Sequence, residues 1–447
     1  MKSKYNSKTK THNLYKILFL FVVFLGIGYA FLEANLNING DVTVEAPELN
    51  IYVQSTNVTS GSTAGTPTII GTDKKEVDFT TALTSDGNSF FEETTTVINK
   101  GSKKAYLSGV DVKVYDGTTE ITLAAPYEYS ITHGDGTPVE PGEELAIAGT
   151  QTYKLKFNYI SGTDMTTVTD YPSYTFKITY NFTKESFADD SWDTIVTKYS
   201  NDPNTYPVGA KKVIQMDLDG DSTPENYTLR IANTSTPEEC SQEGFSQTAC
   251  GLVIEFAERM ANHRMNIDGD PTINGYYNKG GWKYSDMRAY LNGGKYLEGT
   301  TKEIDYSTNG IINLLPSDLR NKIIDTTVIS SYGLNDTTNF VTTDKIYLLA
   351  THEVWEDVDG DANRGIDCYD TSYNNTRQLD YYKEKGVTTN NTLGAIKKDS
   401  FWFLRSAEND TAYIFYGVGP ENDSPGGRIN GIIATSNYTA SPAFRIA

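Results

Sequence analysis

Apolar and polar residues alternate along several stretches between residues 35 and 184. One such run covers residues 153–159, and the clearest comprises Tyr174, Phe176, Ile178, Tyr180 and Phe182. Because successive side chains of a strand point to opposite faces of a sheet, a period of two predicts strands with one buried and one polar face. Turn dipeptides such as Asp116-Gly117 separate the runs. We therefore expect residues 35–184 to form an antiparallel β-sandwich of about seven to nine strands.

The spacing of apolar residues changes after this region. Trp192, Ile195 and Tyr199 fall on one side of a helix, and Ser186 stands where a capping residue is expected. The helix is followed by a short stretch rich in Asn, Asp and Pro, which is typical of a turn or linker. Residues 185–207 are therefore predicted to form a short helix and a linker between two domains.

Residues 208–447 combine helical and strand-like patterns. Residues 252–261 carry apolar side chains at helical spacing, and Ser285 can cap a second helix. Residues 346–350 and 401–404 are continuous apolar runs, which are typical of buried strands. Long loops rich in glycine and asparagine separate these elements. We expect an α+β domain here, so that the whole chain is mainly β plus α+β.

The longest apolar run of the chain lies near its start, at residues 17–32. Five lysines precede it, and acidic residues follow it. A basic flank before an apolar core is typical of an export signal whose N-terminus stays in the cytoplasm. The run is shorter than the ~20 residues of a membrane span, whereas Gly28-Tyr29-Ala30 offers a cleavage site. Residues 1–34 are predicted to be a signal peptide or a membrane anchor, and the protein to be extracellular, on the cell surface or secreted.

The net charge of the chain limits the classes of molecule that it could bind. The formal net charge is −20, and no basic stripe exists beyond the N-terminal tail, so we do not expect nucleic acid as a partner.

Cys240 and Cys250 lie ten residues apart, and in an exported protein they are predicted to form a disulfide, leaving Cys368 free or buried. The alternative is that all three cysteines are reduced core residues. Their spacing fits no zinc pattern.

Acidic residues at alternate positions occur in two segments. The first contains Asp217, Asp219, Asp221 and Glu225, and the second contains Asp357, Asp359 and Asp361. Carboxylates around a glycine turn supply the oxygen ligands that calcium prefers, although the spacing differs from that of an EF-hand. We predict calcium at these segments, with solvated β-turns as the alternative.

The sequence contains no recognisable catalytic arrangement. The four histidines are scattered and have no metal-ligand or triad spacing, so we expect a protein that is not an enzyme. Trp282 and Trp355 lie beside loops and are candidates for stacking on a ligand such as a sugar ring, with burial in the core as the alternative, whereas Trp402 lies in an apolar run and is predicted to be core. Arg405 and Arg445 follow apolar strand residues and are predicted to form ion pairs with carboxylates.

The predicted sandwich region resembles a known class of extracellular protein. Residues 94–101 (TTTVINKG) and 138–145 (PVEPGEEL) are similar to segments of TasA-like and camelysin-like matrix proteins. This resemblance covers about 150 residues, in agreement with the length of one domain. It implies a sandwich fold and assembly into an extracellular fibre or biofilm matrix.

The C-terminal part resembles an uncharacterised domain of Firmicutes cell-surface proteins. Motifs at residues 245–251, 280–282 and 401–406 carry the likeness, which extends over nearly all of residues 208–447. The strands at residues 401–406 and 441–446 also look like the end of C-type-lectin-like folds, including the formylglycine-generating enzyme group. The active-site cysteine pair of that group has no counterpart here, and fold alone does not assign a function.

These patterns lead to one main functional expectation. We expect an exported cell-surface protein of a Gram-positive bacterium whose C-terminal domain binds a cell-wall glycan, a host glycan or a protein ligand without catalysis, with calcium holding its loops. The alternative is a structural component of an extracellular fibre or biofilm matrix. The oligomeric state does not follow from the sequence.

Overall fold

The structure, a computed structural model, describes most of the chain after residue 46. The described residues are 47–61, 63–260, 262–266, 277–295, 304–356, 370–389, 400–420 and 429–447. The predicted export segment at residues 1–34 lies outside them. Among the helices of the described ranges, none combines the length and the apolar character that crossing a membrane requires. The described chain is mainly β, with several sheets, as the sequence predicts.

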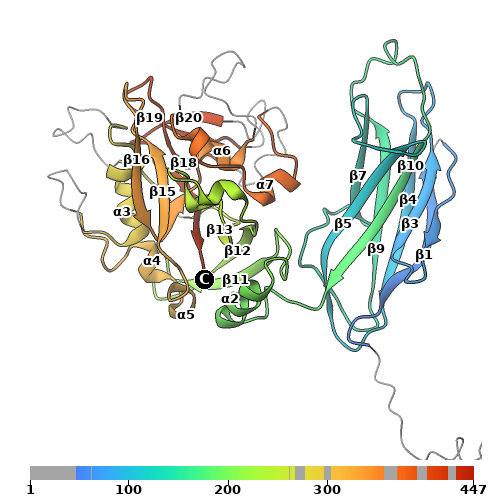
Figure 1. Cartoon of the computed structure of the whole chain (residues 1–447), viewed down its shortest axis with the longest axis horizontal. Helices are drawn as coiled ribbons and strands as arrows, with labels where there is room; N and C mark the ends of the chain where they lie inside the picture. The colour runs from blue at the N-terminus through green and yellow to red at the C-terminus, as the bar shows by residue number, and fades with distance from the viewer. Residues whose placement is uncertain are drawn as a thin grey trace, which may run out of the picture. The chain divides into compact units, whose positions relative to one another are not determined.

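Two antiparallel sheets enclose the first core (Figure 1). The first sheet has the order β1 (Ile51–Gly61), β4 (Phe90–Asn99), β9 (Thr150–Tyr159) and β7 (Tyr127–His133). The second has the order β2 (Thr68–Ile70), β3 (Glu76–Thr81), β10 (Tyr174–Thr183), β5 (Ala105–Asp116) and β6 (Thr119–Ile121), and β8 (Glu144–Leu145) also pairs with β5. Two facing sheets of this kind form a β-sandwich.

Alternate residues of the strands fill the interior of the sandwich. Leu155 and Phe157 of β9 are fully buried, as are Phe176 and Ile178 of β10, so the period of two in the sequence is confirmed. The rings of Phe157 and Phe176 meet across the two sheets with centroids 5.0 Å apart, a spacing at which aromatic pairs attract. One acidic side chain shares this interior, because Glu93 of β4 is also fully buried.

The C-terminal domain contains two larger sheets and a hairpin. One sheet has the order β11 (Lys211–Met216), β12 (Glu225–Asn233), β13 (Val253–Phe256), β22 (Pro442–Arg445) and β17 (Ile346–Leu348). The other has the order β14 (Asn262–His263), β21 (Tyr438–Ala440), β18 (Trp402–Ala407), β19 (Ile414–Val418) and β20 (Ile429–Ile433). The hairpin consists of β15 (Thr326–Ser331) and β16 (Asn339–Asp344). The expected strands at residues 346–350 and 401–404 are thus present as β17 and β18.

Short helices surround these sheets (Figure 1). The α-helices are α2 (Trp192–Asn201), α3 (Asp286–Asn292), α4 (Ile311–Leu314), α5 (Ser317–Arg320), α6 (Thr351–Val354) and α7 (Asp380–Glu384). The 3-10 helices are η1 (Glu238–Ser241), η2 (Gln247–Ala249), η4 (Gly281–Tyr284) and η6 (Tyr373–Asn375). The predicted cap of α3 is confirmed, since the hydroxyl of Ser285 accepts a hydrogen bond from the Arg288 amide at 3.1 Å.

Helix α2 differs from the expectation at its start. Ser191, and not Ser186, caps it, because Ser191 directly precedes the first buried helical residue and accepts a hydrogen bond from the Thr194 amide at 3.2 Å. Trp192 and Tyr206 belong to the core of the C-terminal domain. The segment expected to be a linker is therefore packed into that domain through its aromatic residues.

The helix expected at residues 252–261 is absent, and β13 takes its place. All four residues of Val253–Phe256 are fully buried. Apolar residues of this strand, such as Val253 and Ile254, lie on both of its faces and show no period of two, so the pattern cannot be told from that of a buried helix. Pairing with β12 and β22 determines the outcome here.

Candidate functional site

Two consecutive glycines bring η4 against the β15–β16 hairpin. Gly280 and Gly281 have φ values of 86° and 51°, in the left-handed region. A Cβ atom on Gly281 would lie 1.9 Å from the carbonyl oxygen of Ser331, and a Cβ atom on Gly280 would lie 2.1 Å from the ring of Tyr284. Only glycine tolerates both this backbone conformation and this close approach.

The side chain of Trp282 anchors this turn to the interior of the domain. Its side chain is fully buried, so the prediction that it faces a ligand is wrong. The indole Nε1 donates to Asp344 Oδ2 at 2.9 Å, and Asp344 also accepts from Thr342 Oγ1 at 2.7 Å and from Arg288 Nε at 2.6 Å. A buried carboxylate with three donors is well compensated, and it ties η4 and α3 to β16.

The two residues that follow Trp282 belong to a group of partly exposed side chains, most of them aromatic. We call Lys283, Tyr284, Tyr332 and Phe340 the aromatic cluster; all four are partly exposed. The ring of Phe340 stacks on Tyr332 with centroids 4.5 Å apart and meets Tyr284 edge-on at 5.3 Å. The ammonium group of Lys283 lies 5.1 Å from the centroid of Phe340. Partly exposed rings that a turn and a hairpin bring together beside a cation can pack on the apolar face of a ligand.

Trp355 and Trp402 both lie in the core of the C-terminal domain. Trp355 is only 1% exposed, so the prediction that it stacks on a ligand is also wrong. It directly follows the buried residue Val354 at the end of α6, and this position turns its ring inward. Trp402 is buried as the sequence predicts.

The acidic turn between β11 and β12 gathers three of the predicted calcium ligands. One carboxylate oxygen from each of Asp217, Asp219 and Asp221 lies within 4.8 Å of the others. The same carboxylates accept backbone hydrogen bonds; Asp217 Oδ1 accepts from the Gly220 amide at 2.8 Å. Glu225 is not part of this group, and its Oε2 accepts from the Leu218 amide at 3.4 Å. Stabilisation of the turn explains why acidic residues stand at these positions. The distances between their carboxylate oxygens also suit a cation such as calcium, whose ligands lie at about 2.3–2.6 Å.

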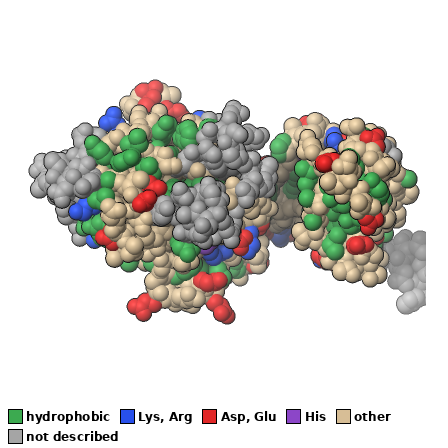
Figure 2. All heavy atoms as spheres, turned by 90° about the horizontal axis from the view of Figure 1, so that it is seen from above, with side chains coloured by type: hydrophobic (Ala, Val, Ile, Leu, Met, Phe, Trp, Pro, Cys, Tyr) green, Lys and Arg blue, Asp and Glu red, His purple; other side chains and the backbone are tan. Residues whose placement is uncertain are grey.

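The second predicted acidic site does not overlap the described part of the chain. Asp357, Asp359 and Asp361 all lie outside the described residues. On the face shown in Figure 2, the acidic side chains that are drawn in colour are scattered over the surface. This distribution is typical of a protein whose negative charge maintains solubility.

The predicted disulfide is present. Cys240 and Cys250 are joined by a bond of 2.05 Å, with their Cα atoms 5.9 Å apart. The bond closes a loop from Cys240 to Cys250 that contains η2, and two residues after Cys250 lead into β13. It therefore fixes the chain beside the sheet of β22.

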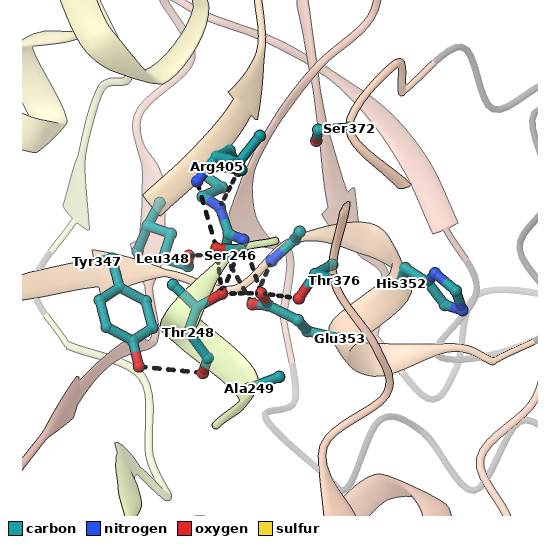
Figure 3. Close-up of polar contacts among 12 residues, drawn as sticks. Ser246, Thr248, Ala249, Tyr347, Leu348, His352, Glu353, Ser372, Thr376 and Arg405 are labelled. Carbon is teal, nitrogen blue, oxygen red and sulfur yellow. Dashed lines mark hydrogen bonds and ion pairs between the residues drawn. The ribbon is translucent and has the colours of Figure 1, made fainter. Parts of the chain in front are cut away.

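A buried ion pair lies at the centre of the C-terminal domain (Figure 3). Arg405 Nη2 and Nη1 donate to the two carboxylate oxygens of Glu353 at 2.6 and 2.7 Å, and both side chains are fully buried. Glu353 also accepts from the hydroxyls of Thr248 and Thr376 and from the Ala350 amide. The predicted ion pair of Arg405 is thus confirmed.

The charge state of this pair follows from its contacts. Burial alone would raise the pKa of Glu353, but Arg405 and the hydrogen bonds hold that pKa below its usual range. A second buried pair, Arg230 with Glu255 at 2.7 Å, lies in the same domain. Both carboxylates are closed off from solvent by their partners, so these pairs organise the core and offer no open site.

The aromatic cluster was not found from the sequence. Tyr284, Tyr332 and Phe340 come from separate segments, and only the pairing of β15 with β16 and the approach of η4 bring them together. The one available signal was the order Phe340, Thr342, Asp344 at alternate positions, which places all three on one face of a strand.

Comparison with known families gives one match. Residues 263–446 match DUF6273, which is described as a domain of unknown function. No curated protein matches the chain, and no solved structure matches it. The matched region contains η4, the aromatic cluster, the Arg405–Glu353 pair and β22.

Proposed function

We propose that this chain is an exported bacterial cell-surface protein that binds a ligand without catalysing a reaction. The C-terminal domain is the binding domain, of C-type-lectin-like type, and the ligand is a glycan of the cell wall or of a host. The observation that carries the proposal is the aromatic cluster, because it exposes part of three rings. Gly280, Gly281 and Trp282 hold the turn that carries one of them, Tyr284, against the β15–β16 hairpin that carries the other two. Aromatic faces pack on the apolar faces of sugar rings, and a preorganised surface loses little entropy on binding.

Replacing Tyr284 by alanine is expected to weaken glycan binding about tenfold, which corresponds to about 1.4 kcal/mol. The reason is the loss of one stacking face, while the buried anchors Trp282 and Asp344 stay in place. The measurement is binding of full-length protein to a panel of peptidoglycan fragments and host glycans, followed by titration of the best ligand.

Tyr413→Ala is the matched control, because Tyr413 is a 45% exposed tyrosine of the same domain outside the cluster. It should bind like the unchanged protein. Equal affinity of both variants would exclude the aromatic cluster as the site. Absence of binding to every glycan would favour assembly into a fibre instead, for which β1, an edge strand of its sheet among the described residues, offers unpaired backbone groups.

The acidic turn adds a calcium site to this proposal. Calcium is expected to slow amide hydrogen exchange at residues 217–225 in full-length protein, because an ion bound by three carboxylates closes the turn. Exchange is compared in calcium and in chelator, and Asp219→Asn should remove most of the difference. Identical exchange in both buffers would reduce the turn to a hydrogen-bonded β-turn.

A further inference from the structure

The sandwich domain contains a cavity of about 480 Å³ where the start of β1 lies beside the turn between β2 and β3. This volume lies in the range of ordinary small-molecule sites. Leu49, Ile51 and Phe182 give the cavity an apolar wall, and all three pack into the core of the sandwich. The lining includes no residue of the aromatic cluster or of the acidic turn, so the cavity is a separate feature of the molecule.

The turn beside the cavity has an unfavourable backbone conformation. Lys74 has a φ value of 53°, in the left-handed region, which a residue with a Cβ atom rarely adopts. Hydrogen bonds to both sheets hold the turn in this conformation. The Val53 amide of β1 donates to the Lys74 carbonyl at 2.7 Å, and the Tyr180 amide of β10 donates to that of Lys75 at 3.2 Å. The edge of the cavity is therefore preorganised, as at many ligand sites.

The two lysines of this turn are available to a ligand. Lys74 and Lys75 line the cavity, are exposed, and form no ion pair with any residue that the structure describes. Asp73 is the single acidic residue of the lining, so the edge of the cavity carries a net positive charge. Arg445, for which the sequence predicts an ion pair, also has none within the described ranges, but its buried Nε is closed to an outside group.

We propose that this cavity binds an amphipathic anion, whose apolar chain lies against Leu49, Ile51 and Phe182 and whose anionic head lies at Lys74 and Lys75. Burial of the chain supplies affinity, because it removes apolar surface of both the ligand and the wall from water. The two ammonium groups select an anionic head over a neutral or cationic one. The site does not depend on glycan binding by the C-terminal domain.

The test follows the δ1-methyl signal of Ile51 by NMR in full-length protein labelled with ¹³C at the isoleucine methyl groups. The signal is identified by its loss in Ile51→Val. Sodium decanoate, kept below the concentration at which it forms micelles, should shift the signal saturably. Acetate has the same head without the chain, and decyltrimethylammonium has the chain with the opposite charge. Each of these two probes should bind at least tenfold more weakly than decanoate.

A double variant separates the charge of the turn from its conformation. Lys74→Gly combined with Lys75→Gln removes both ammonium groups, while glycine adopts a φ value of 53° without strain, so the turn should keep its shape. Decanoate should bind this variant about tenfold more weakly than the unchanged protein. Lys156→Gln, which removes an exposed lysine from the outer face of β9, is the matched control and should leave the affinity unchanged.

Three results would overturn the proposal. The first is the lack of a saturable Ile51 shift with decanoate, which would show that the cavity holds only water. The second is equal affinity for decanoate and decyltrimethylammonium, which would show that the lysines do not select the head group. The third is unchanged decanoate affinity of the double variant, which would place the head group away from the turn.

Discussion

Replacing Arg405 by methionine is expected to lower the free energy of unfolding of the C-terminal domain by about 3–5 kcal/mol. The substitution keeps much of the side-chain volume but leaves the Glu353 carboxylate buried without its two guanidinium donors. This loss is a large fraction of the stability of an ordinary domain. Urea unfolding followed by tryptophan fluorescence measures it selectively, because all four tryptophans belong to the core of this domain.

Two further variants separate the effect of charge from that of packing. Adding Glu353→Gln to Arg405→Met should recover part of the loss, because the amide removes the uncompensated charge while keeping an acceptor for Thr376. Arg259→Met, at an exposed position, should change stability by less than about 0.5 kcal/mol. A loss below about 1 kcal/mol for Arg405→Met would show that the pair contributes little beyond packing.

The stability of the sandwich domain is expected to fall as the pH rises from about 4.5 to 7, and the group responsible is Glu93. Burial raises the pKa of this carboxyl to about 7, against the opposing effect of hydrogen bonds from Thr95 and Thr56 at 2.9 Å. The folded state therefore keeps a proton that the unfolded chain has already lost. The stabilisation from this proton is fully present below pH 4.5, decreases between pH 4.5 and 7, and is absent above pH 7. The total loss in the free energy of unfolding is about 3 kcal/mol at most.

The contacts of Glu93 explain why no ion pair offsets this loss. Its Oε1 has no partner among the described residues, and the nearby Tyr180 hydroxyl is also buried without one. Calorimetry of full-length protein between pH 4.5 and 8 measures the sandwich transition. Glu93→Gln should flatten its pH dependence and stabilise the domain at pH 8, whereas Glu92→Gln on the outer face of β4 should leave the slope unchanged. A parallel slope for Glu93→Gln would assign the pH dependence to another group.

The strands of the sandwich are predictable because each has one buried and one solvated face. The alternation at residues 153–159 and in β10 gives both the element and its orientation. In the C-terminal domain the same reasoning fails at β13, where burial on both faces removes the alternation. Helix starts are predictable only where a single candidate cap precedes the first buried turn, as at Ser285, and not where Ser186 and Ser191 compete.

The candidate sites are harder to predict because they depend on contacts between distant segments. The disulfide could be predicted from the cysteines and the oxidising environment expected for an exported protein, and the ion pair of Arg405 from its residue type. Neither prediction requires knowledge of where the partner residue lies. Trp282 and Trp355 were misjudged because flanking loop residues do not show which way an indole points. The aromatic cluster arises from the pairing of β15 with β16 and from the approach of η4, which no local pattern specifies.

The position of β22 has a consequence for the order of folding. This strand lies between β13 and β17 and pairs Val253 with Arg445, residues that are far apart in the sequence. Closing so long a loop costs entropy before any contact compensates for it, so the five-stranded sheet forms late and slowly. Until residues 442–445 are in place, β13 and β17 expose apolar strand edges. An incompletely folded chain would then be most prone to aggregation at these two edges, and a chaperone that binds extended apolar segments would protect it there.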